Sequence, residues 1–410
     1  MRKPALGPNE SDTPWLQAEQ HRAYLRVDAQ RQVEFFRSSF RSEGGFHSLD
    51  RIGRPLPELP QYLHSNARMV HSFVLAKLAG FDDCDRFIDH GMQYIRQCHH
   101  DPDHGGYLWA VNDRDVCDDR KLAYGHVFVL LAAASAHAAG HPDAMALLDD
   151  VDGILDRYFW EDDVGRFCDE WNRDWAPFST YRGMNANMHG TEALLAAFEA
   201  TGREKYLKRA GRILDFFINT IARSENWRLP EHYDASWQID RNYSEDPMFR
   251  PPGTTPGHSF ELARLLLQYG ELVGRPAGEH LQSARNLAYR ALEDAWDHER
   301  GGFVYTLDFS GTPDIRDRYW WPVTEAIGVL AAFLKSDPTP EDEIWYRRVW
   351  AFADAHLVDH EYGGWFHELD ADNHPSDGQF VGKPDIYHSL QAALLPLTRN
   401  VSGCYRGEIC

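Results

Sequence analysis

The 410-residue sequence predicts an all-α fold, an (α/α)6 barrel of two concentric helical layers with short β-hairpins in the connecting loops. Three observations lead to this prediction. A glycine motif recurs about every sixty residues, charge-rich helical segments alternate with nearly charge-free ones, and polar side chains gather where the charge-free segments begin.

The recurring motif is a pair of glycines followed by an aromatic residue. It occurs at residues 44–46, 105–107, 301–303 and 363–365, with degenerate copies at 164–167 and 226–232. A constant period of this length indicates a repeat architecture, and six units fill the chain. In stretches such as DHERGGFVYTLD the motif lies between aspartates, which is typical of a short β-hairpin or an extended loop.

Two kinds of helical segment alternate between these motifs. A charge-rich, amphipathic helix is expected at a surface, whereas a helix that is apolar all round is expected to be buried. We expect outer helices at residues 16–36, 83–98, 143–160, 203–222, 278–296 and 341–357. We expect inner helices at residues 64–78, 122–139, 189–200, 258–273, 322–334 and 385–397. Because no low-complexity segment interrupts the pattern, we expect one catalytic domain over residues 1–410.

Composition limits the kinds of partner. A formal charge of −21 and a pI near 5.4 argue against nucleic acid or an anionic membrane. No apolar run approaches the ~20 residues of a membrane span, and the first residues lack a hydrophobic signal core, so we expect a cytoplasmic protein. Six cysteines without a CxxC pair predict neither a disulfide framework nor a zinc module. The 13 tryptophans fit either a large core or a cleft that stacks sugar rings.

The polar residues of the inner helices lie at or near their starts. In a closed barrel these starts all face one end, so six clusters are expected to converge on one funnel. The clusters are Arg68 and His71; Tyr124 and His126; Asn185, Asn187, His189 and Glu192; His258 and Glu261; Trp320, Trp321 and Glu325; and Asp385 and His388.

Each residue also has a structural interpretation. A single histidine near a helix start is usually a core or capping group, and Asn185 and Asp385 have the residue types of helix caps. Arg68 and Glu192 are candidates for an ion pair between inner helices. The joint recurrence favours function, because a packed barrel has no structural need for several histidines at one end.

The stretch around His258 is the strongest single candidate for chemistry. A Pro-Gly turn at residues 256–257 leads into the fourth inner helix, and Glu261 follows His258 at i+3, on the same helix face. Unsatisfied amides at a helix start favour a neutral imidazole and an anionic ligand. A titratable pair at this position suits proton transfer to a small substrate.

Other motifs in the sequence give weaker indications of function. The stretch CHHDPDH at residues 98–104 has metal-ligand residue types, but it lies in a solvent loop of the repeat and no second ligand cluster accompanies it. The sequence has no HExxH, P-loop or GxSxG motif. We therefore expect no metal and no cofactor.

With these motifs located, the sequence resembles the N-acylglucosamine 2-epimerase superfamily, and within it the aldose–ketose isomerase branch. The resemblance spans nearly the whole chain and rests on HSNARMVHSF, KLAYGHVFVLL, YRGMNANMHGTEALL, PGTTPGHSFELARLL, RYWWPVTEAIG and KPDIYHSLQA, in that order. The family fold is an (α/α)6 barrel. The sequence Pro-Gly-His-Ser-Phe-Glu at the fourth inner helix is closer to the isomerase branch than to cellobiose 2-epimerases.

The resemblance implies an assignment of site residues. The family's catalytic histidines fall on His258 and His388. Its substrate-binding positions fall on Arg68, His189, Glu261, Tyr124, Asn185, Trp321 and Asp385.

The implied activity is interconversion of D-mannose and D-fructose, and also of D-lyxose and D-xylulose, through an enediolate formed by removal of the C2 proton. An imidazole has an unperturbed pKa of ~6.5, which suits reversible proton transfer near neutrality. The substrate is a free monosaccharide, and we expect a monomer or a homodimer. Alternatives are a sugar 2-epimerase of the mannose/glucose or N-acylglucosamine type, a sulfoquinovose isomerase, an (α/α)6 glycoside hydrolase or lyase, and a non-catalytic interaction protein on the same scaffold.

Overall fold

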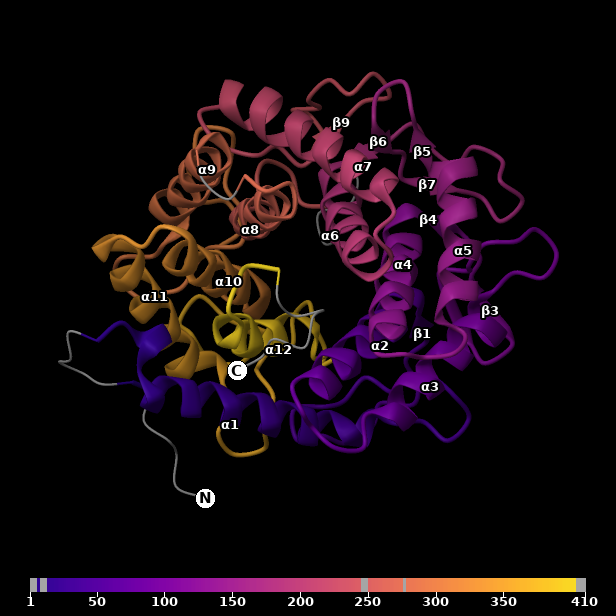
Figure 1. The fold of residues 1–410 in the computed structure, drawn as a ribbon, viewed down its shortest axis with the longest axis horizontal. Coiled ribbons are helices and arrows are strands. Elements are labelled where there is room, and N and C mark those ends of the chain that lie inside the picture. Colours follow the sequence, from indigo (N-terminus) through magenta and orange to yellow (C-terminus); the bar gives the residue numbers. More distant parts are fainter. Residues whose placement is uncertain (1–5, 8–12, 245–249, 276–277, 403–410) are drawn as a thin grey trace.

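The protein forms a closed double ring of helices in a computed structural model that describes residues 6–7, 13–244, 250–275 and 278–402 (Figure 1). The outer ring consists of α1 (Glu19–Phe36), α3 (Asp85–Tyr94), α5 (Ala144–Ile154), α7 (Glu204–Leu214), α9 (Glu279–Ala295) and α11 (Pro340–Phe352). The inner ring consists of α2 (Leu63–Leu78), α4 (Ala123–Ala138), α6 (Met184–Thr201), α8 (Pro256–Leu272), α10 (Trp320–Ser336) and α12 (Tyr387–Leu394).

Each inner helix contacts the next, and α12 contacts α2, so the inner ring is closed. The predicted (α/α)6 barrel is therefore confirmed. Four outer helices end in a π-helical turn, at Ile95–His99, Leu155–Phe159, Asp215–Ala222 and Ala353–Leu357. These turns account for most of the difference between the ends of these α-helices and the predicted ends of the outer segments.

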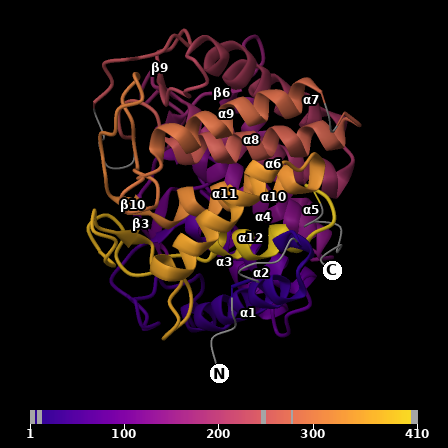
Figure 2. The same ribbon diagram turned by 90° about the vertical axis from the view of Figure 1, so that its left-hand side faces the viewer.

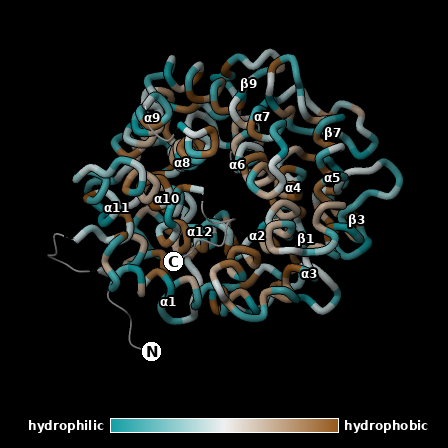
Figure 3. The backbone as a smooth tube through the Cα atoms, in the orientation of Figure 1, coloured by the Kyte–Doolittle hydropathy of each residue, from teal (hydrophilic) through white to brown (hydrophobic). Residues whose placement is uncertain are grey.

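The two rings differ in burial as their charge patterns predict. The outer helix α7 buries Tyr206, Leu207, Ala210, Ile213 and Leu214, which form one stripe at helical spacing. The inner helix α4 is buried along almost its whole length. Hydrophobic segments gather between the two rings, and hydrophilic ones lie mainly on the outside and in the loops (Figure 3).

The glycine motifs form tight hairpins between an outer helix and the following inner helix. The antiparallel pairs are Phe40 with Phe46, His100 with Tyr107, β5 (Trp160–Glu161) with β6 (Arg166–Phe167), Trp296 with Phe303, and Val358 with Trp365. Gly301 and Gly302 have φ of 74° and 77°, which a side chain would disfavour. The predicted short β-hairpins are confirmed.

A second set of strand pairs links neighbouring connections at the same end of the barrel. The three-stranded sheet is β1 (Gln61–Tyr62), β2 (Ala110–Asn112) and β3 (Asp115–Asp118). The two-stranded sheets are β4 (Lys121–Leu122) with β7 (Glu170–Trp171), β8 (Arg182–Gly183) with β9 (His232–Tyr233), and β10 (Arg318–Tyr319) with β11 (Glu368–Leu369). Single bridges join Thr254 to Leu307 and Lys383 to Leu49, so the last connection pairs with the first.

Buried cations tie the hairpins to the strands that precede the inner helices. Lys383 and Asp359 form an ion pair of 2.6 Å with almost no exposed side-chain area, and Nζ of Lys383 also donates to the carbonyl of Gly363 at 2.8 Å. The same arrangement recurs as Lys121 with Asp101 and Gly105, and as Arg318 with Asp297 and Gly301. Arg182, which is half-buried, pairs with Glu161. These pairs hold the strands in front of α4, α6, α10 and α12.

In the part of the chain that the structure describes, no helix is both long enough and apolar enough to cross a membrane. Four cysteines in these ranges, Cys84, Cys98, Cys117 and Cys168, are free thiols. Cys404 and Cys410 lie outside the described residues.

Replacing Asp359 with Ala leaves the ammonium of Lys383 buried without its carboxylate. We expect the free energy of unfolding to fall by about 3–5 kcal/mol, the usual cost of breaking a buried pair. Urea unfolding measures this. The control is Glu34→Ala, which removes an exposed partner of Arg37 and should cost far less. Equal losses in the two variants would contradict the proposed role of the buried pairs.

Candidate active site

The first turns of the inner helices and the strands before them lie at one end of the barrel. In the side view, strands β3, β9 and β10 lie together at the left of the barrel (Figure 2). The first backbone amides of α2, α4, α6 and α10 donate to carbonyls of the next connection, those of Trp109, Asp169, Glu231 and His367. Because backbone carbonyls satisfy these amides, the side chains of the first turns are available for other contacts.

His258 lies in the first turn of α8 and is tied to a carboxylate. Its Nδ1 is 2.9 and 3.0 Å from the two oxygens of Glu231, which precedes β9. Pro256 is the first residue of α8, where its fixed φ suits a helix start. Gly257 is required by packing, because a Cβ atom there would lie 2.3 Å from the ring of Trp321. The Pro-Gly turn therefore brings Trp321 against His258, with ring centroids 4.8 Å apart.

His388 lies in the first turn of α12 and has its own carboxylate. Its Nδ1 is 2.8 Å from Oε1 of Glu325 on α10. Burial lowers the pKa of His388, and the hydrogen bond to Glu325 only partly opposes this. The Trp321 ring lies 6.0 Å from the His388 ring, so one indole contacts both imidazoles. The two histidines are thus brought together around one aromatic surface, as the sequence predicts.

Arg68 on α2 is held by polar and aromatic groups. Its guanidinium donates to Oδ2 of Asp385 at 3.3 Å and to the hydroxyl of Tyr124 at 2.7 Å. It also lies 4.5 Å from the ring centroid of Phe128 and 4.8 Å from that of Tyr387. Burial raises the pKa of Asp385, but the charge of Arg68, with smaller effects from neighbouring groups, outweighs it and holds that pKa below its usual range. The site therefore contains a fixed, buried positive charge.

His189 and two glutamates lie deeper in the same cluster. Nδ1 of His189 is 3.4 Å from Oε1 of Glu261 and 3.6 Å from Oε2 of Glu192. Burial lowers the pKa of His189 to about 3, so the imidazole is neutral. Burial, then the charges of Glu325 and Glu192, raise the pKa of Glu261 far above its usual range. Neither carboxyl oxygen of Glu261 has a hydrogen-bond partner in the described part of the chain, so no hydrogen bond there stabilises its ionised form.

Asn185 and Asp385 have the residue types of helix caps, and their contacts differ. Asn185 lies in the first turn of α6 and is partly exposed, and its buried Oδ1 has no hydrogen-bond donor among the described residues. Its role in binding, like the roles of the other predicted site residues, stays a prediction. Asp385 also accepts from the backbone amide of Tyr387 at 3.0 Å, so it caps α12 as well as pairing with Arg68.

Several alternatives from the sequence are now decided by contacts. The predicted ion pair between Arg68 and Glu192 is wrong, because Arg68 pairs with Asp385. Glu192 instead lies 3.9 Å from Arg264 and accepts a hydrogen bond from the hydroxyl of Tyr387. His126 is structural: its ring bonds the carbonyl of Leu122 and the amide of Tyr107.

Sequence reasoning missed Glu231 and Arg264. Glu231 falls in the degenerate copy of the repeat at residues 226–232, and no spacing rule points from it to His258. Arg264 lies within a largely apolar stretch of α8, where a buried arginine is itself a signal of a buried carboxylate.

Two sets of side chains have metal-ligand geometry. The ligand atoms of His189, Glu192 and Glu261, and those of Glu261, Glu325 and His388, lie within 4.8 Å of one another. In the second set, Nδ1 of His388 is committed to Glu325, and Arg264 already supplies a cation to that carboxylate. In the loop at residues 98–104, Asp101 pairs with Lys121 and Arg173, which supports a structural interpretation of that stretch.

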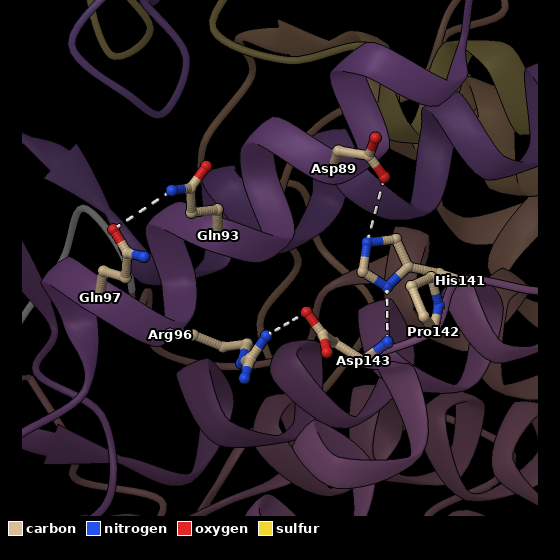
Figure 4. Close-up of a pocket in the computed structure, with 7 residues that line it drawn as sticks. All are labelled: Asp89, Gln93, Arg96, Gln97, His141, Pro142 and Asp143. Atoms are coloured by element: carbon tan, nitrogen blue, oxygen red, sulfur yellow. Dashed lines mark hydrogen bonds and ion pairs between the residues drawn. The ribbon is translucent and has the colours of Figure 1, made fainter.

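A separate surface pocket lies on the outer ring, between α3 and the start of α5 (Figure 4). It is lined by Asp89, Gln93, Arg96, Gln97, His141, Pro142 and Asp143. Its polar groups bond one another: Arg96 with Asp143 at 2.5 Å and His141 with Asp89 at 3.2 Å. None of the residues predicted to act on a substrate lines it.

Taken together, the fold and the site define an (α/α)6-barrel protein whose inner helices enclose a buried cluster of histidines, carboxylates and two arginines. The family model for N-acylglucosamine 2-epimerase matches residues 44–392. A D-mannose isomerase of Thermobifida fusca is 41% identical over 391 residues, 94% of this chain and 96% of that protein. A D-mannose isomerase of Pseudomonas cannabina pv. alisalensis is 39% identical, with 95% of each chain covered.

Solved structures agree. A crystal structure of D-mannose isomerase superposes with a TM-score of 0.84 at 30% identity, covering 94% of this chain and 97% of that one. The chain belongs to the N-acylglucosamine 2-epimerase family.

The two central glutamates should respond oppositely to pH when each is replaced by Gln. The pKa of Glu261 is raised in the folded state, so its ionisation destabilises the fold as pH rises above the unfolded value of ~4.3. Glu261→Gln should therefore gain melting temperature relative to wild type between pH 5 and 8.

The pKa of Glu192 is lowered, because the contact with His189 and the charge of Arg264 outweigh burial. Its stabilisation is present above the unfolded pKa and is lost as pH falls, so Glu192→Gln should be less stable than wild type at pH 7. Melting curves at several pH values test both variants. A loss of stability in Glu261→Gln that grows with pH would contradict a neutral Glu261.

Proposed function

We propose that the chain is an aldose–ketose isomerase that interconverts D-mannose and D-fructose, with His258 and His388 as its acid–base pair. The observation that carries the proposal is the similarity to D-mannose isomerases over nearly the full length of both chains. The site supports it independently, because two histidines, each with its own carboxylate, flank one aromatic ring beside a buried arginine.

The reaction moves two protons and no other atom. A base removes the C2 proton of the open-chain aldose while the C1 carbonyl oxygen gains a proton, giving an enediol or its anion. The proton then returns to carbon at C1, and the O2 hydroxyl loses its proton to form the ketose. A pair of imidazoles can perform both exchanges, since each can accept or donate a proton near neutral pH.

Charge in the site fits this chemistry. Because burial keeps His388 neutral, it is ready to accept a proton, and Arg68 offers a fixed positive charge to the oxygen that becomes anionic. Glu231 and Glu325 each face the Nδ1 atom of one histidine, which leaves both Nε2 atoms for the sugar. In this proposal, Asp385 and Tyr124 position Arg68.

The remaining predicted residues bind the sugar. Trp321 offers its ring to the sugar between the two histidines. Nδ1 of His189 faces Glu192 and Glu261, which leaves its Nε2 for a hydrogen bond with a sugar hydroxyl. Asn185 is placed in the first turn of α6 for a similar contact.

A neutral sugar fits the connections at the open end better than a sulfonated one. Three arginines there already have carboxylate partners: Arg120 with Asp118 at 2.6 Å, Arg182 with Glu161 at 2.5 Å, and Arg250 with Glu170 at 3.0 Å. A sulfonate would have to displace one of these carboxylates. This favours mannose and lyxose over the sulfoquinovose alternative.

Incubating the purified chain with D-mannose should give D-fructose, and D-lyxose should give D-xylulose, with and without a chelator. With deuterium at C2, the label should appear at C1 of the ketose or in water. Chromatography and NMR identify the products. Glucose as the sole product would support the 2-epimerase alternative, and no turnover of any free aldose would support the non-catalytic one.

Replacing His258 or His388 with Asn should lower kcat for mannose about 10²–10⁴-fold, the usual contribution of general acid–base catalysis, while circular dichroism stays unchanged. A matched control is His141→Asn in the surface pocket of Figure 4, a histidine that also faces a carboxylate and should keep full activity. Near-normal activity in either site variant would contradict the assignment of the pair.

A further inference from the structure

The carboxyl groups of Glu192 on α6, Glu261 on α8 and Glu325 on α10 lie close together among the inner helices. Arg264 lies between Glu192 and Glu325. Arg264 on α8 has Nε 3.4 Å from Oε2 of Glu325 and Nη2 3.9 Å from Oε1 of Glu192. Only 4% of its surface is exposed. Buried anions are strongly destabilising unless a counter-charge is present, and Arg264 supplies it here.

The neighbouring helix is shaped to admit this arginine. A Cβ atom at Gly328 on α10 would lie 3.1 Å from Cδ of Arg264, which is tighter than usual van der Waals contact. Gly328 follows Glu325 by three residues, so the carboxylate and the gap lie on the same face of α10. Arg264 is thus seated against α10 beside the carboxylate that His388 uses.

The two oxygens of Glu325 have separate partners. Oε1 is 2.8 Å from Nδ1 of His388, and Oε2 faces Arg264. Burial alone would raise the pKa of Glu325, but the charge of Arg264 and the hydrogen bond from His388 outweigh it and leave that pKa below its usual range. An ionised Glu325 only accepts hydrogen bonds, so Nδ1 of His388 must carry a proton and Nε2 is the nitrogen left for exchange.

We propose that Arg264 is a positioning residue of the isomerase: by pairing with Glu325 it holds that carboxylate as the acceptor for Nδ1 of His388 and so presents Nε2 to the sugar. This inference rests on the proposed function. Arg264 itself touches no reacting atom in this account and acts only through Glu325 and His388.

Other titratable and charged groups also face this pair, and they are left unchanged in the Arg264 variants. They are Arg68 from α2, His189 and Glu192 from α6, Glu261 from α8, and His367 and Asp385 from the last connection. Because Glu325 and His388 titrate as a unit, the measurable quantity is the pH at which the pair takes up one further proton.

The test compares Arg264→Gln with Arg264→Lys in mannose turnover between pH 5 and 9. Without the cation, the pair takes up a proton more readily, so in Arg264→Gln the acid limb of kcat/KM should move to higher pH by about one unit. We expect kcat to fall at least about 10-fold, since the acid–base geometry is lost, with KM little changed. Arg264→Lys keeps the charge and should restore the limb and part of kcat.

Glu192→Gln gives a prediction of opposite sign. It removes a negative charge near the pair, and Arg264 then has Glu325 as its carboxylate partner. Both changes disfavour uptake of a proton by the pair, so the acid limb should move to lower pH. A control for general destabilisation is Arg285→Gln, which breaks a partly buried pair with Asp342 between α9 and α11 at 2.7 Å. That variant should lose melting temperature and keep the wild-type limb.

The inference would be overturned if the acid limb of kcat/KM did not move in Arg264→Gln, or if kcat fell equally in the Gln and Lys variants. It would also be overturned if the limb moved in the same direction in Arg264→Gln and Glu192→Gln. If Arg264→Gln fails to fold, the acid limbs of kcat/KM in Arg264→Lys and Glu192→Gln still test the inference. A wild-type chain that turns over no aldose would contradict the proposed function, and this inference with it.

Discussion

The site depends on a ring of backbone pairs that closes at the open end of the barrel. Each strand or residue in front of an inner helix pairs with the next connection along the chain, and Lys383 pairs with Leu49 to join the last unit to the first. Since every inner helix starts at this ring, its first turn is held in register with its neighbours. Side chains more than 300 residues apart in sequence, such as Arg68 and Asp385, meet for this reason.

The ionisation states of the buried carboxyl groups follow from the cations that this ring places beside them. Lys121, Arg318 and Lys383 are buried cations that hold the hairpins, whereas Arg68 and Arg264 lie among the inner helices and face carboxylates there. Burial would otherwise drive the glutamates to their neutral forms. Counter-charges keep Glu192 and Glu325 ionised, and Glu261, which accepts no hydrogen bond among the described residues, is the one left to carry a proton.

Much of this arrangement could be predicted from the sequence, because period and charge pattern are local properties. The sixty-residue repeat gave the two rings and the hairpins, and the position of polar residues at the helix starts gave the convergence of His258 with His388. The partners of those histidines could not be derived in the same way. Glu231 reaches His258 from a loop whose repeat motif has degenerated, and Glu261, three residues from His258 in sequence, faces His189 instead.

The proposed chemistry needs a base that is neutral before the reaction and cationic during it. Burial, with Arg68 nearby, favours the neutral form of His388 at rest. When a proton leaves C2, the sugar becomes an enediolate, and this new anion offsets the positive charge of Arg68 felt by the imidazole. The same event that needs the histidine to hold a proton therefore makes holding it favourable, and it does so only while the anion exists. A site whose resting charges were already balanced for the imidazolium would lack this coupling.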